Sequence, residues 1–131
     1  MKKTTQFLRL FVAITLFVSL NACSAAAQSA LEPAAFEAKI ATPNVQLVDV
    51  RTPLEFANGH LAKAQNINVN DAEFKQKIAL LDKSKPIAVY CGVGKRSEKA
   101  SKILTELGFK DITDLAGGIT AWSAANKKIV K

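Results

Sequence analysis

Residues 86–97 read Pro-Ile-Ala-Val-Tyr-Cys-Gly-Val-Gly-Lys-Arg-Ser, an apolar run followed by a basic, glycine-rich loop. The first five residues are typical of a buried strand, and apolar residues recur at helical spacing after Ser97. Cys91 is therefore expected where a strand gives way to the N-terminus of a helix. Backbone N–H groups and the helix dipole favour negative charge at such a position. We interpret Cys91 as a nucleophile that reacts as its thiolate.

Strand-like and helix-like segments alternate on both sides of this loop. Thr52, Pro53 and Glu55 predict a capping box, which opens a helix that ends at Gly59 in a left-handed conformation. Strands are expected at 45–50, 65–69, 86–90 and 111–115, and helices from Glu32–Pro33, Thr52, Asn70–Asp71, the Cys91 loop and Gly117–Gly118. This alternation predicts an α/β fold in three layers, with a small, mostly parallel sheet flanked by helices on both faces.

The first 22 residues are predicted to be a signal peptide. Three cations precede the apolar run 10–20, which is short for a membrane span and has the length of a secretory core. Two cleavage routes are open. A lipobox-like end would make Cys23 a lipidated residue, whereas Ala25–Ala27 matches an A-x-A site for soluble export. Both routes predict a periplasmic protein, and the first route alone predicts membrane contact, through an N-terminal lipid on Cys23.

The remaining chain is expected to form a single domain. Residues 23–30 have small side chains and predict a tether, residues 31–126 a domain with one core, and residues 127–131 a basic tail. Loss of the leader removes three of 18 cationic residues, which leaves 15 against 11 acidic residues. This excess of cationic residues is modest, and aromatic residues are not interleaved with them, so nucleic-acid binding is not predicted. We expect a monomer.

The cysteine count restricts the chemistry. The chain has two cysteines and one histidine, and Cys23 falls in the processed region. Cys91 is then the only thiol expected in the mature domain. No C-x-x-C pair is present for a dithiol mechanism, and a structural zinc site lacks ligands. We therefore predict no metal, no cofactor and a reaction that proceeds through one cysteine.

Three motifs follow one another along the chain: residues 49–56 with 59–61 and 64–67, the C-x-x-G-x-R loop at 91–96, and residues 107–109 and 115–119 with Trp122. They resemble, in this order, the first signature, the active-site loop and the closing pattern of the rhodanese domain family. The resemblance covers residues 31–125 and implies an exported, single-domain bacterial rhodanese. It implies a thiosulfate sulfurtransferase, in which Cys91 takes the outer sulfur of thiosulfate as a persulfide and passes it to cyanide or a thiol.

The resemblance also implies a set of residues that bind the substrate anion. They are Gly92, Val93, Gly94, Lys95, Arg96 and Arg51. Gly92 stands where the family often has a large or polar side chain, so Lys95 becomes the expected cationic contact. Arg96 and Arg51 have an alternative role as members of structural ion pairs with nearby carboxylates.

The sequence also bears on alternative functions. Dual-specificity phosphatases share the fold, but their loop is C-x5-R, whereas Cys91 to Arg96 is C-x4-R. The intact Cys91 loop disfavours a non-catalytic rhodanese-like binding module. His60 is disfavoured as a base because it follows a predicted helix-ending glycine. A persulfide carrier with a protein acceptor stays open. As a sulfur donor, 3-mercaptopyruvate is less favoured than thiosulfate, because the active loop typical of mercaptopyruvate sulfurtransferases lacks the two cations Lys95 and Arg96.

Overall fold

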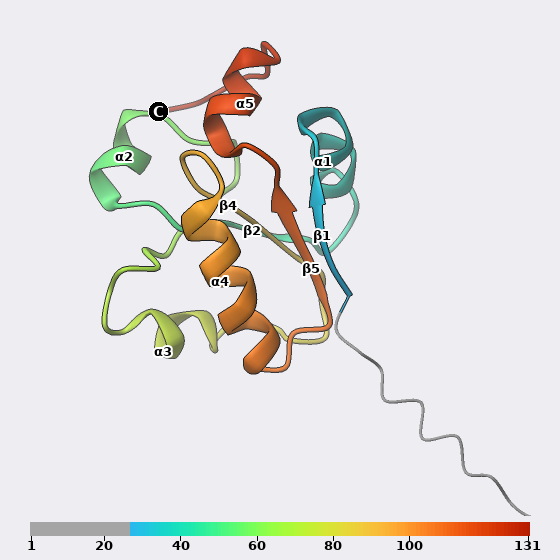
Figure 1. Cartoon of the computed structure of the whole chain (residues 1–131), viewed down its shortest axis with the longest axis vertical. Coiled ribbons are helices and arrows are strands. Elements are labelled where there is room, and N and C mark those ends of the chain that lie inside the picture. The colour runs from blue at the N-terminus through green and yellow to red at the C-terminus, as the bar shows by residue number, and fades with distance from the viewer. Residues whose placement is uncertain (1–26) are drawn as a thin grey trace, which may run out of the picture.

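The computed structural model describes residues 27–131, so the predicted signal peptide and Cys23 lie outside the described residues. The strands are β1 (Ala27–Leu31), β2 (Gln46–Asp49), β3 (Gln65–Asn66), β4 (Ile87–Tyr90) and β5 (Asp111–Leu115). The helices are α1 (Pro33–Ile40), α2 (Pro53–Asn58), α3 (Phe74–Ile78), α4 (Lys95–Glu106) and α5 (Gly118–Ala124). The strands form one sheet in the order β1-β5-β4-β2-β3, and every pair is parallel, which confirms the predicted α/β fold (Figure 1). None of the helices within 27–131 has the length and apolar character needed to cross a membrane.

The two faces of the sheet carry separate apolar cores, because side chains alternate along each strand. From β4 and its end, Ile87, Val89 and Cys91 enter the core beneath α3 and α4. Ala88 and Tyr90 enter the opposite core, beneath α1 and α5. All four residues of β4 are buried, as expected for a central strand of a parallel sheet. Cys91 thus follows a rigid, fully enclosed strand.

The predicted tether is wrong for residues 27–30. These residues belong to β1, an edge strand in which Ala27 lies opposite Asp111 and Leu31 lies opposite Leu115 of β5. Residues 27–30 are exposed, so the strand depends on backbone pairing with β5 and needs no apolar alternation of its own. The small side chains therefore gave no strand pattern, and the domain begins earlier than predicted.

The predicted basic tail also docks on the domain. His60 and Val130 pair as an antiparallel bridge, with N···O distances of 2.9 Å in both directions. The Trp122 indole donates to the Lys128 carbonyl at 3.0 Å, and the C-terminus lies beside α2 in Figure 1. Gly59 has φ 150° and ψ 135° rather than the predicted left-handed helical values. This positive-φ conformation, which favours glycine, leads the chain from α2 into the bridge.

The start of α3 differs from its prediction. The helix begins at Phe74 with Glu73 at the N-cap, not at Asn70–Asp71. The Asp71 carboxylate instead accepts a hydrogen bond from the Asn68 side chain at 3.0 Å. The Asp71 carbonyl accepts from the Phe74 N–H at 3.1 Å, which closes a turn before the helix. Local hydrogen bonding of this kind competes with helix capping. The strand expected at 65–69 is similarly reduced to the two residues of β3.

Candidate active site

Cys91 lies at the carboxyl end of β4, the edge at which ligands bind to parallel sheets. Its side chain is 1% exposed. The Sγ accepts the Gly94 N–H at 3.1 Å and lies 3.4 Å from the Ser97 hydroxyl. Gly94 has φ 116°, a conformation that favours glycine and turns its N–H toward the sulfur. Because α4 begins at Lys95, the positive end of its dipole lies beside the thiol, as the sequence predicts.

Helix α5 fixes the Cys91 loop through two backbone hydrogen bonds. The N–H groups of Ile119 and Thr120 donate to the carbonyls of Cys91 and Gly92, at 2.9 and 3.1 Å. A Cβ on Gly118 would lie 2.5 Å from both of these carbonyl oxygens, closer than real Cβ contacts allow. Gly118 therefore sets how closely α5 approaches the loop. Sequence reasoning identified this glycine as part of a helix start and of the closing motif, but not as a contact of the Cys91 loop.

Arg96 forms a bidentate ion pair with Glu55, with N···O distances of 2.7 and 2.8 Å. Glu55 also accepts the Thr52 N–H at 3.0 Å, which completes the predicted capping box of α2. A Cβ on Gly92 would come within 3.1 Å of Arg96 Nη2, so the missing side chain leaves room for the guanidinium. The hydrogen bonds to Glu55 raise the pKa of Arg96, and the charge of nearby Cys91 acts in the same direction.

Arg51 forms a buried ion pair with Asp49. Its Nη2 donates to the Asp49 carboxylate and to the Gly59 carbonyl, both at 2.7 Å. Its guanidinium carbon lies 5.7 Å from the centroid of the Tyr90 ring. These contacts tie the end of β2 to the end of α2. The geometry supports the structural alternative for Arg51.

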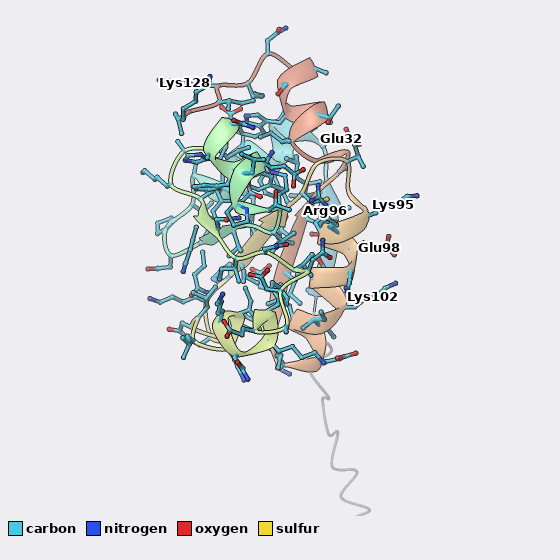
Figure 2. All side chains as sticks on the ribbon, turned by 90° about the vertical axis from the view of Figure 1, so that its left-hand side faces the viewer. Glu32, Lys95, Arg96, Glu98, Lys102 and Lys128 are labelled. Atoms are coloured by element: carbon cyan, nitrogen blue, oxygen red, sulfur yellow. The ribbon has the colours of Figure 1, made fainter. Side chains whose placement is uncertain are left out.

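The structure does not bring Lys95 to the thiol. Its exposed side chain lines a surface hollow with Lys75, Lys99 and Lys102. Figure 2 shows Lys95 and Lys102 extending outward from α4. The side chain of Val93 is 65% exposed on the outer turn of the loop. The described contacts therefore place the Gly94 N–H on Cys91 Sγ and hold the Arg96 guanidinium in a structural ion pair with Glu55, beside Gly92, whereas Lys95 points outward.

His60 has local structural contacts. Its Nδ1 lies 3.0 Å from the Phe56 carbonyl, and its ring stacks on the Phe56 ring with centroids 3.7 Å apart. Its backbone is paired with Val130. These contacts fix His60 at the end of α2.

Sequence reasoning missed two buried polar residues of this region. The Ser97 side chain is buried between Cys91 Sγ and the Gly94 carbonyl, which lies 3.1 Å from its hydroxyl. Asp114 lies on β5, and burial raises its pKa to about 6. A carboxylate two residues beyond the apolar Ile112, on the same face of a buried strand, is the signal that would have indicated this position.

The Arg96–Glu55 ion pair should make the free energy of unfolding depend on pH. Hydrogen bonds from Arg96 and Thr52 lower the pKa of Glu55 to about 2 from its ordinary value of 4.5. Because the folded-state pKa is depressed, the stabilisation is complete above pH 4.5 and disappears as the pH falls toward 2. The Glu55 side chain is 38% exposed. Screening by solvent therefore limits the contribution to about 1 kcal/mol.

We expect Glu55→Gln to lower the free energy of unfolding by about 1 kcal/mol at neutral pH. The difference from wild type should shrink progressively below pH 4.5, as urea unfolding at several pH values would reveal. Glu98→Gln is a matched control, since Glu98 forms an exposed pair with Lys102 at 3.2 Å and its loss should change little. An identical loss for Glu55→Gln at every pH would contradict the assignment.

Comparisons with known proteins identify relatives with this architecture. A family model described as "Rhodanese-like domain" matches residues 32–125. The thiosulfate sulfurtransferase GlpE of Shewanella oneidensis is 39% identical over 83 residues, which cover 63% of this chain and 80% of that protein. The tRNA uridine(34) hydroxylase of Cytophaga hutchinsonii is 41% identical over 92 residues, 68% of this chain but 30% of that protein. The crystal structure of a rhodanese-related protein from Thermoplasma volcanium aligns with a TM-score of 0.69 at 31% identity, covering 78% of this chain and 97% of the other.

Proposed function

This chain belongs to the rhodanese-like family, and we propose that it is a thiosulfate sulfurtransferase that works through a persulfide on Cys91. The observation that carries the proposal is the environment of the sulfur. Cys91 Sγ accepts the Gly94 N–H at 3.1 Å, directly before α4 begins. A backbone donor and a helix N-terminus together favour an anionic sulfur.

In the proposed first step, the Cys91 thiolate attacks the outer sulfur of thiosulfate. A new S–S bond forms at Sγ, the S–S bond of thiosulfate breaks, and sulfite leaves with the bonding electrons. The persulfide is an anion like the thiolate, so the Gly94 N–H and the start of α4 stabilise both species. The hydrogen bonds from α5 fix these donors before substrate arrives.

In the second step, a thiophilic acceptor attacks the terminal sulfur of the persulfide. Cyanide becomes thiocyanate and the Cys91 thiolate is restored, so no external oxidant or reductant is needed. A thiol acceptor would take the sulfur in the same way and become a persulfide itself. We propose cyanide as the assay acceptor and a thiol as the cellular one.

We propose that Arg96, rather than Lys95, supplies the cation beside the substrate anion. Lys95→Ala should change KM for thiosulfate by no more than about twofold, since its exposed charge is screened by salt. Arg96→Lys should raise KM by about tenfold, because a single ammonium cannot reproduce the bidentate bond to Glu55 that orients the guanidinium. Steady-state kinetics would measure both, and a larger effect from Lys95→Ala would reverse the assignment.

The thiosulfate:cyanide assay tests the proposed function directly. We expect thiocyanate to form with ping-pong kinetics, the pattern of a covalent intermediate. Absence of turnover would count against the activity. A higher kcat/KM with 3-mercaptopyruvate would retain the persulfide and reassign the donor.

A sulfur relay to another protein is the second candidate. Val93, on the outer turn of the active loop, is an apolar side chain that is largely exposed. Such a residue suits contact with a protein surface better than contact with a small anion. Val93→Ser should then slow sulfur transfer to a protein thiol and leave transfer to cyanide unchanged, whereas equal rates with both acceptors would argue against the relay.

We also propose export to the periplasm, on the basis of the leader alone. Intact-mass analysis of protein extracted from cells would distinguish the two processing routes. A lipid on Cys23 would support membrane anchoring, whereas an N-terminus after Ala27 would support soluble export. Retention of residues 1–22 would contradict both.

A further inference from the structure

We propose that a hollow between α1 and α5 binds small organic anions that carry one carboxylate on an apolar body, the chemistry of a medium-chain fatty acid. The α1–α5 hollow is lined by residues of α1, the start of β2, the segment 61–63, α5 and the C-terminal segment. None of its lining residues belongs to the Cys91 loop. The inference therefore goes beyond the proposed sulfur transfer.

The lining of the α1–α5 hollow is mainly apolar. Leu61 and Trp122 are buried members of the core beneath α1 and α5, and Ile40, Val45 and Leu47 are half-buried residues that pack against this core. An engineered cavity of ~150 Å³ holds one benzene molecule. The α1–α5 hollow has a volume of about 290 Å³. It therefore has room for an apolar body of roughly eight carbon atoms.

The charged groups at this hollow favour an anion. Three charged side chains line it, those of Glu37, Lys63 and Lys128. The Glu37 carboxylate is already paired with the Lys127 ammonium. Within residues 27–131, neither Lys63 nor Lys128 forms an ion pair. Two uncompensated cations beside an apolar surface are complementary to a carboxylate attached to an apolar body.

The backbone of Lys63 indicates that its side chain has a role. Lys63 has φ 67°, in the left-handed region, where every residue except glycine is strained. Among residues 27–131, the other non-glycine residues with positive φ are Asn44 and Asn126, and asparagine is common in this conformation. Because glycine would remove the strain, folding stability alone does not explain a lysine here. Strained residues of this kind cluster at ligand sites.

Trp122 makes the hollow rigid and provides a probe of its occupancy. The indole donates to the Lys128 carbonyl at 3.0 Å, and its ring packs edge-on against Phe36 with the centroids 6.4 Å apart. A ligand would therefore meet a side chain that is already ordered, which lowers the entropic cost of binding. Trp122 is the only tryptophan of the chain, so indole fluorescence reports on this hollow alone.

Titration of the full chain with octanoate, followed by Trp122 fluorescence, is the direct test. We expect a saturable change with a Kd below about 1 mM, which is attainable for a ligand of about ten non-hydrogen atoms. The uncharged analogue 1-octanol should bind about fivefold more weakly, and octylammonium more weakly still. Absence of a saturable change would overturn the site. Binding of 1-octanol or octylammonium as tight as that of octanoate would overturn its preference for an anion.

Lys63→Gly separates recognition from folding. The substitution removes the cation and the strain together. We expect octanoate affinity to fall about threefold and 1-octanol affinity to stay unchanged, while the midpoint of urea unfolding does not fall. Asn44→Gly is the matched control, because Asn44 has φ 66° and lies outside the lining, so both affinities should be retained. Unchanged octanoate affinity in Lys63→Gly would remove Lys63 as the contact of the carboxylate.

Ala62→Phe tests the location of the site. Ala62 is exposed and lines the hollow, so a phenylalanine ring there should fill it and abolish the fluorescence change with octanoate. Ala35→Phe is the control, since Ala35 is an exposed residue of α1 outside the lining. Full octanoate affinity in Ala62→Phe would show that octanoate binds elsewhere and would overturn the proposal. Because these titrations need no sulfur donor, their outcome is independent of the thiosulfate assay.

Discussion

Cys91→Ser is expected to reduce thiocyanate formation from thiosulfate and cyanide by at least about a thousandfold, the scale seen when a catalytic nucleophile is removed. A serine hydroxyl is not ionised at neutral pH and cannot carry a persulfide. The substitution replaces one atom in a side chain that is almost completely buried, and Gly94 can donate to the serine oxygen as it does to the sulfur. The loop should therefore keep its conformation.

Thermal unfolding is the control for this variant. Cys91→Ser should melt close to wild type, which would separate loss of chemistry from loss of fold. Activity within a few-fold of wild type in a folded Cys91→Ser protein would remove Cys91 as the nucleophile.

Gly118→Ala is expected to lower kcat about a hundredfold, because displacing catalytic groups by about 1 Å has an effect of this size. The added Cβ would lie 2.5 Å from the carbonyl oxygens of Cys91 and Gly92. These atoms belong to the backbone and cannot rotate away. The loop and α5 would have to separate, which breaks the hydrogen bonds from Ile119 and Thr120 that fix the donors.

Gly108→Ala is the matched control for Gly118→Ala. Gly108 has φ 96° and Gly118 has φ 61°, so alanine is strained at both positions, by about 1 kcal/mol. A Cβ at Gly108 meets no atom within 4 Å. Both variants should lose stability in urea unfolding, whereas only Gly118→Ala should lose most of its kcat. Equal kcat values in the two variants would show that α5 does not position the loop.

The parts of the fold that sequence predicted correctly depend on local chemistry. The capping box of Thr52 and Glu55 needs only residues three apart, and it is present as expected. The alternating strands and helices likewise carry their own patterns. By contrast, β1 exists because β5 offers a backbone edge, and the C-terminal residues dock because His60 is extended opposite Val130. Such long-range backbone pairing leaves no signal in the small or basic side chains involved.

The same distinction applies to the candidate active site. Cys91 and Gly94 were placed correctly because the turn between a strand and a helix is encoded within a few residues. Lys95 and Arg96 are adjacent on α4, and neighbouring residues of a helix point in different directions. Which of the two faces the loop depends on the burial of Ser97 and Ala100 against the sheet. Asp114 reaches the site only because β5 lies next to β4, and strand order is not readable from the alternation of elements.

The mass of the protein after incubation with thiosulfate is the most direct test of sulfur transfer through Cys91. We predict that the peptide containing Cys91 gains the mass of one sulfur atom, and that cyanide removes this mass as thiocyanate appears. Peptide mapping separates Cys91 from Cys23 in the full chain. Thiocyanate formation without sulfur on the Cys91 peptide, or the same mass gain in Cys91→Ser, would contradict the mechanism.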